Sequence, residues 1–195
     1  MMERKTLLID VDDTLNRMQV DLLRFVNKRS PNPYRYWQLT SSDRESKDNV
    51  LDALVQEYLS RPDLVVRTRP FENALEGVKL LHSAGYNLHI SSSRKEELHQ
   101  ATLGWLEKHG FYPFITDIHP RPSSIGGPEF KVKTAQKVNA IAAFDDTKSA
   151  IDALAESGVA VYLIRRPWNK EVLGNSLVRP YPSFYRAVLG FLNQP

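Results

Sequence analysis

The chain contains no cysteine, and this absence removes several chemistries at once. Disulfide bonds, thiolate zinc sites and cysteine nucleophiles are all excluded. No stretch approaches the roughly 18 consecutive apolar residues that a membrane helix needs. The first residues, Met1–Lys5, run directly into a predicted strand and do not read as a signal peptide. We therefore expect a cytoplasmic protein with no membrane partner.

A large excess of one charge is also absent. The sequence has 26 Lys and Arg against 23 Asp and Glu, which gives a net charge of +3. A surplus this small is ordinary for a protein surface and does not by itself imply nucleic acid as a partner. The length of 195 residues and the hydrophobic content of 42% fit one domain, or one domain with a small insertion.

What the sequence does have is two acidic strand ends. The apolar run Leu7–Ile9 leads into carboxylates at Asp10, Asp12 and Asp13, and Ala140–Phe144 leads into the pair Asp145–Asp146. Carboxylates this close repel one another, and a bound cation would remove the repulsion. The alternative to a cation site is a solvated acidic turn, but this explanation is less convincing because the pattern occurs twice. Since ligands bind at the C-terminal ends of parallel strands, the pattern predicts a Mg²⁺-dependent site.

The hydrophobic pattern alternates between strands and helices. Strands are expected at 5–10, 86–90, 114–118, 140–144 and 159–164, and helices at 17–28, 48–60, 72–84, 95–109, 130–139, 148–157 and 183–192. Two prolines bracket a further short piece, 62–70, which we expect to be extended. This order predicts an α/β fold: a Rossmann-like parallel sheet of about five strands with helices on both faces.

The segment 16–69 contains helical patterns but no clear strand. A direct strand–helix–strand crossover needs only about 30 residues in all. The surplus predicts a small helical cap over residues 16–69, inserted after the first strand, and a core domain made of residues 1–15 and 70–195.

Four features lie at strand ends or just before one, and their residue types fit phosphoryl transfer to a carboxylate. They are Asp10 with Asp12, the hydroxyl of Ser92, a lysine near 131, and Asp145 with Asp146. A carboxylate can attack phosphorus to form an acyl phosphate that water then hydrolyses. A second carboxylate can serve as general acid and base, while a hydroxyl and a lysine hold the phosphate oxygens.

These motifs resemble those of the haloacid dehalogenase-like (HAD-like) superfamily. The first motif is Asp10–Thr14, the second is Ser92–Arg94, and the last is the pair Asp145–Asp146. The resemblance implies that Asp10 is the nucleophile and that Asp12 is the general acid and base. It also implies Mg²⁺ bound by Asp10, Asp12, Asp145 and Asp146. The second aspartate of the motif favours a phosphatase over a dehalogenase, and Asp13 stands where many members have glycine.

Three assignments remain open within this resemblance. Ser91 is the alternative to Ser92 as the phosphate-binding hydroxyl. Lys131 shares a helix face with apolar residues and is preferred as the phosphate-binding lysine, but Lys133 stays open. Arg94 contacts the phosphate or is a surface residue at the start of the following helix.

Two stretches point to a subfamily. Arg69–Leu75 and Leu163–Asn169 are similar to segments of the 5′(3′)-deoxyribonucleotidase-like group, which implies a nucleoside monophosphate as substrate. Ser92–Arg94 is also similar to 3′-phosphatases that act on nucleic-acid ends. A general small-metabolite phosphatase and a non-catalytic phosphate-binding module are further alternatives.

The remaining polar residues are expected to have structural roles. Arg165 and Arg166 are expected to be a solvated basic pair, and Trp168 and Asn169 to pack and turn the chain. The histidines are scattered without metal-ligand spacing, so no metal site is predicted from them: His82, His89, His99, His109 and His119.

Overall fold

A computed structural model describes residues 4–40, 48–170 and 174–194. Within them one parallel sheet has the strand order β3-β2-β1-β4-β5-β6. The strands are β1 Thr6–Ile9, β2 Asn87–Lys95, β3 Asp117–Arg121, β4 Ala140–Asp145, β5 Ala160–Ile164 and β6 Val178–Tyr181. The predicted fold class is confirmed, with six strands instead of about five.

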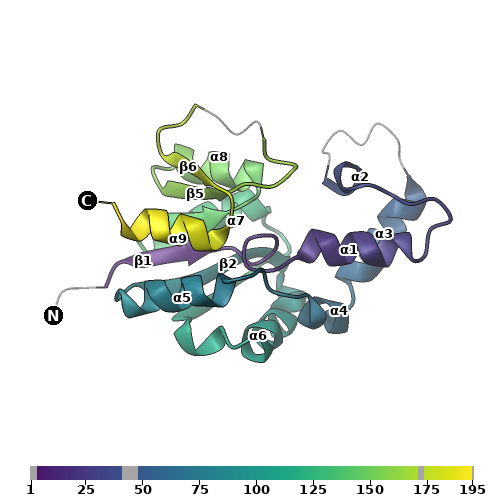
Figure 1. Cartoon of the computed structure of the whole chain (residues 1–195), viewed down its shortest axis with the longest axis horizontal. Coiled ribbons are helices and arrows are strands. Elements are labelled where there is room, and N and C mark those ends of the chain that lie inside the picture. Colours follow the sequence, from purple (N-terminus) through teal and green to yellow (C-terminus); the bar gives the residue numbers. More distant parts are fainter. Residues whose placement is uncertain (1–3, 41–47, 171–173, 195) are drawn as a thin grey trace.

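Helices cover both faces of this sheet (Figure 1). One face carries α5 Ala74–Ser83, α6 His99–Lys108 and α9 Phe184–Leu192, and the other carries α7 Gly127–Lys137 and α8 Lys148–Glu156. Successive residues of β1 point to opposite faces, so Leu7 and Ile9 join the first buried cluster while Leu8 joins the second. A strand buried on both sides explains the continuous apolar run in the sequence.

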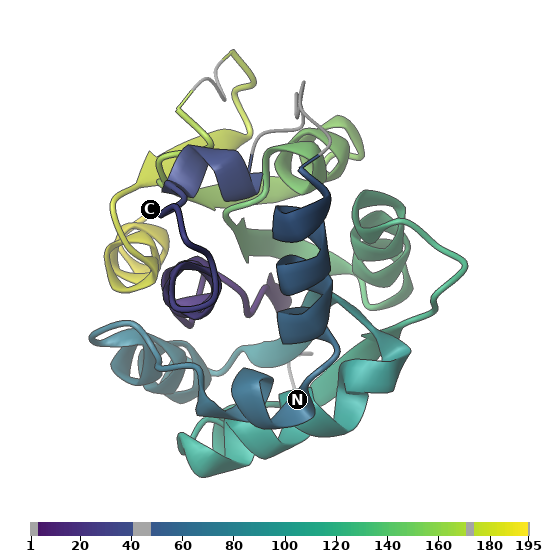
Figure 2. The same cartoon turned by 90° about the vertical axis from the view of Figure 1, so that its right-hand side faces the viewer.

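The other helices stand in front of the C-terminal edge of the sheet (Figure 2). They are α1 Met18–Asn27, α2 Tyr36–Thr40, α3 Asn49–Leu59 and α4 Pro62–Arg67, and they share a hydrophobic cluster of their own. The chain leaves the sheet and returns to it side by side, through an antiparallel bridge between Asn16 and Pro70. No helix in the described part of the chain is long and apolar enough to cross a membrane.

Prolines explain two differences from the predicted elements. Residues 62–67 form a helix and not an extended piece, because Pro62 occupies the first helical turn, where its fixed φ suits the helix. The strand β6 was not predicted because it contains Pro180. It lies at the edge of the sheet, where a missing backbone donor is tolerated.

The ends of two strands also differ. The third strand begins at Asp117 and not at Phe114, because Phe114 is the last residue of the short 3₁₀ helix Tyr112–Phe114. The second strand continues past Ile90 to Lys95, so the serine-rich stretch lies within the strand and α6 begins only at His99.

Candidate active site

A buried lysine joins the ends of the two central strands. Asp10 follows β1 and donates its backbone N–H to the carbonyl of Phe144 at 3.0 Å, so it lies beside Asp145 at the end of β4. Lys131, in the first turns of α7, reaches both carboxylates: its Nζ lies 2.7 Å from Asp10 Oδ1 and 2.5 Å from Asp145 Oδ2. The lysine is only 1% exposed. Strand pairing thus brings together residues that are more than 100 positions apart.

A third carboxylate, that of Asp146, completes the cluster. One oxygen each of Asp10, Asp145 and Asp146 lies within 4.8 Å of the other two, and all three residues are buried. Asp146 Oδ2 accepts a hydrogen bond from Trp168 Nε1 at 2.9 Å, but its Oδ1 is buried with no partner. Buried polar atoms without a partner are uncommon, and a bound ion is one of the groups that can satisfy such an atom.

The charges of this cluster do not balance. Burial raises the pKa of Asp10 well above its ordinary value, and the nearby Asp145 and Asp146 add to the rise in spite of Lys131. The pKa of Asp146 is raised well above normal for the same reasons, burial first and then neighbouring carboxylates. Burial alone would lower the pKa of Lys131, but Asp10 and Asp145 outweigh it and raise that pKa, so this lysine stays charged.

One ammonium group thus faces three buried carboxylates, and a divalent cation would offset the excess. Hard carboxylate oxygens are the ligands that Mg²⁺ takes in proteins. The unpartnered oxygen of Asp146 and the charge excess therefore fit the predicted metal.

Asp12 is held apart from this cluster by Arg94. The guanidinium donates to both carboxylate oxygens, from Nε to Oδ2 at 2.8 Å and from Nη2 to Oδ1 at 2.6 Å. Asn16 donates a further hydrogen bond to Oδ1 at 3.0 Å. Burial alone would raise the pKa of Asp12, but the charge and hydrogen bonds of Arg94 outweigh it and lower that pKa. Arg94 is thus a buried partner of Asp12 and not a surface residue.

The backbone at Asp13 has a conformation that suits glycine better than most residues. Its φ is +58°, in the left-handed region that only glycine adopts freely and that aspartate and asparagine tolerate best. The side chain accepts hydrogen bonds from the backbone N–H of Gln19 at the start of α1, at 3.1 and 3.2 Å. Asp13 therefore links the turn after β1 to the helix α1.

The segment after β5 braces the acidic turns, through the packing and chain-turning roles expected of Trp168 and Asn169 and through a contact of Arg166 that the sequence does not predict. Arg166 Nε donates to the backbone carbonyl of Asp13 at 2.7 Å, and Asn169 Nδ2 donates to that of Asp146 at 2.7 Å. Trp168 bonds Asp146 and stacks with Tyr36 of α2, with ring centroids 6.3 Å apart. Arg166 is thus not a solvated residue.

Strand alternation separates the two candidate serines. On β2, Leu88 and Ile90 pack into the cluster under α5 and α6, so Ser91 faces the opposite side, which α7 covers. Ser91 Oγ is buried and has no partner, whereas Ser92 Oγ accepts a hydrogen bond from the backbone N–H of Arg94 at 3.3 Å. Ser91 is therefore the serine on the side of Lys131.

The alternative lysine lies elsewhere. The side chain of Lys133 is 59% exposed and forms an ion pair with Glu129, one helical turn earlier, at 2.6 Å. Its ammonium group points to solvent and away from the buried carboxylates.

A cleft of about 570 Å³ leads from Asp12 to the helices α3 and α4. We call it the cap cleft. Its lining comes from the turn after β1, the end of β2 and the 3₁₀ helix that follows it, the end of β3, and the junction of α3 and α4: Asp12, Gln56, Leu59, Ser60, Pro62, Ser93, Arg94, Lys95, Glu97, Leu98 and Arg121. The volume falls within the range of about 300–1,000 Å³ that is usual for small-molecule sites.

Comparison of the fold with solved structures gives clear matches over the whole chain. A HAD-like family hydrolase from Streptococcus pneumoniae has a TM-score of 0.71 and 15% identity, and the match covers 99% of this chain and 100% of that one. A predicted phosphatase from Clostridium acetobutylicum has a TM-score of 0.73 and 11% identity, with 98% and 99% covered. A HAD hydrolase from Bacillus subtilis with bound magnesium has a TM-score of 0.63 and 16% identity, with 98% and 100% covered.

At the level of sequence, no protein-family model and no curated protein matches the chain. At identities this low the structural matches establish the fold. The chain thus has the HAD-like fold that the motifs predicted.

Proposed function

We propose that this protein is a Mg²⁺-dependent phosphomonoesterase that works through an aspartyl-phosphate. One observation carries the proposal: a buried Asp10 lies at a strand end within reach of Lys131 and of two further carboxylates. The HAD-like fold supports it, because similar structures include one described as a phosphatase and one with bound magnesium.

In the first step a carboxylate oxygen of Asp10 attacks phosphorus, and the bond from phosphorus to the ester oxygen breaks. Asp12 protonates the departing alkoxide. In the second step Asp12 takes a proton from water, the water oxygen attacks the same phosphorus, and the bond to Asp10 breaks to release phosphate. Mg²⁺, held by Asp10, Asp145, Asp146 and the backbone carbonyl of Asp12, would neutralise negative charge on the phosphate oxygens.

Lys131 and a serine hydroxyl bind the remaining phosphate oxygens in this scheme. Arg94 holds the pKa of Asp12 low in the free protein, so the proton that Asp12 passes to the alkoxide comes from a phosphate ester that binds as its monoanion.

The direct test is hydrolysis of an aryl phosphate by the full chain with Mg²⁺ and with a chelator. We expect phosphate release that stops on chelation and returns when Mg²⁺ is restored. Phosphate binding without any turnover in Mg²⁺ would instead favour the non-catalytic module.

The hydroxyl of Ser91, and not that of Ser92, is proposed to bind the phosphate. Ser91→Ala is expected to lower kcat/KM on the aryl phosphate by about 100-fold, the scale of losing one donor to a developing charge. Ser92→Ala serves as the matched control and should change kcat/KM by only a few fold. The reverse order of effects would restore Ser92.

The cap, residues 16–69, is proposed to select the substrate because α3 and α4 form the outer wall of the cap cleft. We propose a nucleoside monophosphate as substrate, in line with the subfamily resemblance. Its base and sugar would fill the cleft. A panel of phosphorylated metabolites that includes deoxynucleoside monophosphates tests this choice, and faster turnover of a sugar phosphate would count against it.

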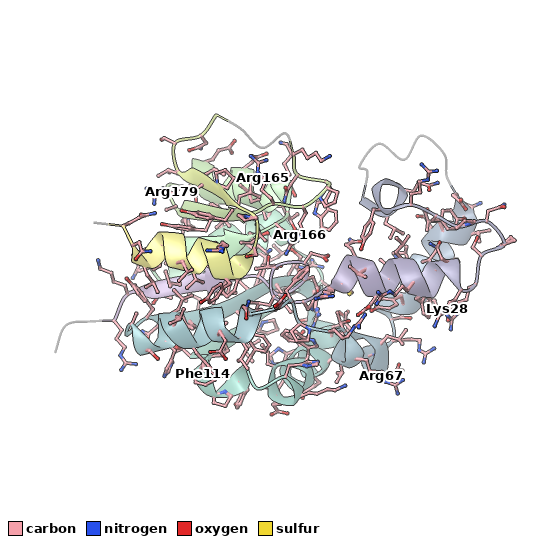
Figure 3. All side chains as sticks on the ribbon, viewed as in Figure 1. Lys28, Arg67, Phe114, Arg165, Arg166 and Arg179 are labelled. Atoms are coloured by element: carbon pink, nitrogen blue, oxygen red, sulfur yellow. The ribbon has the colours of Figure 1, made fainter. Side chains whose placement is uncertain are left out.

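A basic groove on the cap favours a second candidate, phosphate removal from nucleic-acid ends. The groove has a volume of about 410 Å³ and joins six basic side chains to one acidic one. Those basic residues are Arg24, Lys28, Arg29, Arg61, Arg67 and Arg69. Among the described residues neither Lys28 nor Arg67 forms an ion pair, and Figure 3 places both on one side of the cap.

Phe25 and Tyr58 lie at the bottom of this groove and are only 7% and 3% exposed, so its cations would make the contacts. Basic side chains along a groove suit the phosphates of a nucleic-acid strand. Comparing a 3′-phosphorylated oligonucleotide with the mononucleotides, at two salt concentrations, separates the two candidates. Preference for the oligonucleotide that fades at high salt supports the second.

A further inference from the structure

The edge of the sheet brings together two histidines that are 30 positions apart. His89 lies on β2 and His119 on β3, and the register pairs His89 with Asp117 and Ser91 with His119. His89 Nδ1 lies 2.8 Å from His119 Nε2, and the two rings are nearly parallel, with an interplanar angle of 14°. Sequence spacing could not reveal this pair, because the contact depends on strand register.

A carboxylate stands beside the pair. Asp117 Oδ2 lies 3.7 Å from His119 Nε2, while its Oδ1 accepts the backbone N–H of Ile118 at 2.8 Å, which orients the group. One donor atom each of His89, Asp117 and His119 lies within 4.8 Å of the other two. The side chain of His119 is 9% exposed and that of Asp117 is 59% exposed, so the cluster opens to solvent on the carboxylate side.

We propose that His89, His119 and Asp117 form a second metal site, specific for a divalent transition metal such as Zn²⁺. Imidazole is a good ligand for Zn²⁺ and a poor one for Mg²⁺, so this site and the carboxylate cluster select different ions. Two histidines and one carboxylate are a common ligand set for zinc, with water in the fourth position. The exposed side of Asp117 gives that water access.

The geometry needs only a small adjustment to accept the ion. With Zn–N bonds of about 2.0–2.1 Å in tetrahedral geometry, the two nitrogens would lie about 3.3 Å apart. The observed separation of 2.8 Å is that of a hydrogen bond between the rings. The donor ring must move its proton to its other nitrogen, and both nitrogens then face the metal with no net loss of a proton.

The surroundings of both rings favour the neutral form, which is the form that binds a metal. Burial lowers the pKa of His89, and Asp117 only partly opposes it. Burial also lowers the pKa of His119, helped by His89 and by Lys137 at the end of α7 and opposed by Asp117.

The site is separate from the proposed catalytic centre. His89 precedes Ser91 by two residues on the same face of β2, a rise of roughly 7 Å along the strand. A metal there would join β2 to the edge strand β3 beneath α7 and would stabilise that edge. It does not depend on the proposed phosphatase activity.

The test is titration of the full chain with Zn²⁺ and Co²⁺ in excess Mg²⁺, which occupies the carboxylate cluster. We expect one equivalent to bind, with the visible spectrum of four-coordinate Co²⁺, and Zn²⁺ to raise the melting temperature. His89→Ala and His119→Ala should each weaken binding by at least about 100-fold, and Asp117→Asn by about tenfold. His82→Ala, a histidine on α5 beside Phe114, is the matched control and should bind as the wild type does.

A second measurement does not depend on the folding of any variant. In the wild-type protein with ¹⁵N-labelled histidine, Zn²⁺ should shift the side-chain signals of two of the five histidines. Unshifted His89 and His119 signals at saturating Zn²⁺, or unchanged affinity in both alanine variants, would overturn the proposal.

Discussion

Asp10→Asn is expected to abolish phosphate release while leaving the fold intact. The amide cannot form an acyl phosphate, so kcat should fall by at least about 10⁴-fold, the scale of removing a covalent nucleophile. The stability of the Asp10→Asn variant should not fall with its activity and is expected to rise or stay the same. Asp10 is buried among carboxylates that raise its pKa, so replacing it removes a charge that the fold tolerates poorly. In Mg²⁺-free buffer the melting temperature should therefore equal or exceed that of the wild type.

The matched control for this variant is Asp152→Asn on α8. Asp152 forms an exposed ion pair with Lys148 at 2.6 Å, so its loss should change stability by less than about 1 kcal/mol and leave turnover unchanged. Steady-state kinetics and thermal denaturation of both variants give the comparison. If Asp10→Asn turned over at the wild-type rate, Asp10 would not be the nucleophile.

The architecture could be predicted because its signals are local. Apolar runs such as Leu7–Ile9 and Ala140–Phe144 mark strands buried on both faces, and the carboxylates that follow them mark the edge where ligands bind. Parallel strands put both acidic ends at one edge of the sheet, and the pairing of β1 with β4 makes Asp10 and Asp145 neighbours there. The same reasoning placed a lysine from a preceding helix near that edge.

What the sequence could not reveal depends on the face and register of each strand. Ser91 and Ser92 are adjacent and chemically identical, and only the packing of Ile90 shows which of them faces α7. The histidine pair depends on how β3 aligns with β2, and β3 itself begins later than the pattern indicated. Such assignments need the sheet and not only the periodicity.

The individual bonds from Arg166 and Trp168 to the acidic turns could not be predicted, for a different reason. Arg166 and Trp168 act through a backbone carbonyl and a single carboxylate oxygen, and no motif encodes such contacts. A basic pair is solvated in most sequences, and here the fold carries one of its members into the space between the sheet and the cap (Figure 3). Basic pairs are usually solvated, but in this fold the packing around Arg166 buries most of its side chain.

Lys131→Met is expected to damage both stability and activity, because the lysine holds the only ammonium group bonded to the carboxylate cluster among the described residues. Breaking a buried ion pair by removing one partner costs about 3–5 kcal/mol. We expect a loss of that size in urea denaturation without Mg²⁺, and a partial recovery when Mg²⁺ is added. Turnover with Mg²⁺ should fall by about 10²–10³-fold, because a charge that stabilises the transition state is lost.

Lys133→Met, two residues along the same helix, is the matched control, because it removes the same charge without touching the buried carboxylates. Lys133 has an exposed pair with Glu129, and losing it should cost less than about 1 kcal/mol. Both substitutions remove one positive charge from α7, so an effect of net charge alone would appear equally in the two variants. Only contact with Asp10 and Asp145 predicts a large difference between them. Equal losses would mean that Lys131 does not hold the two strand ends together.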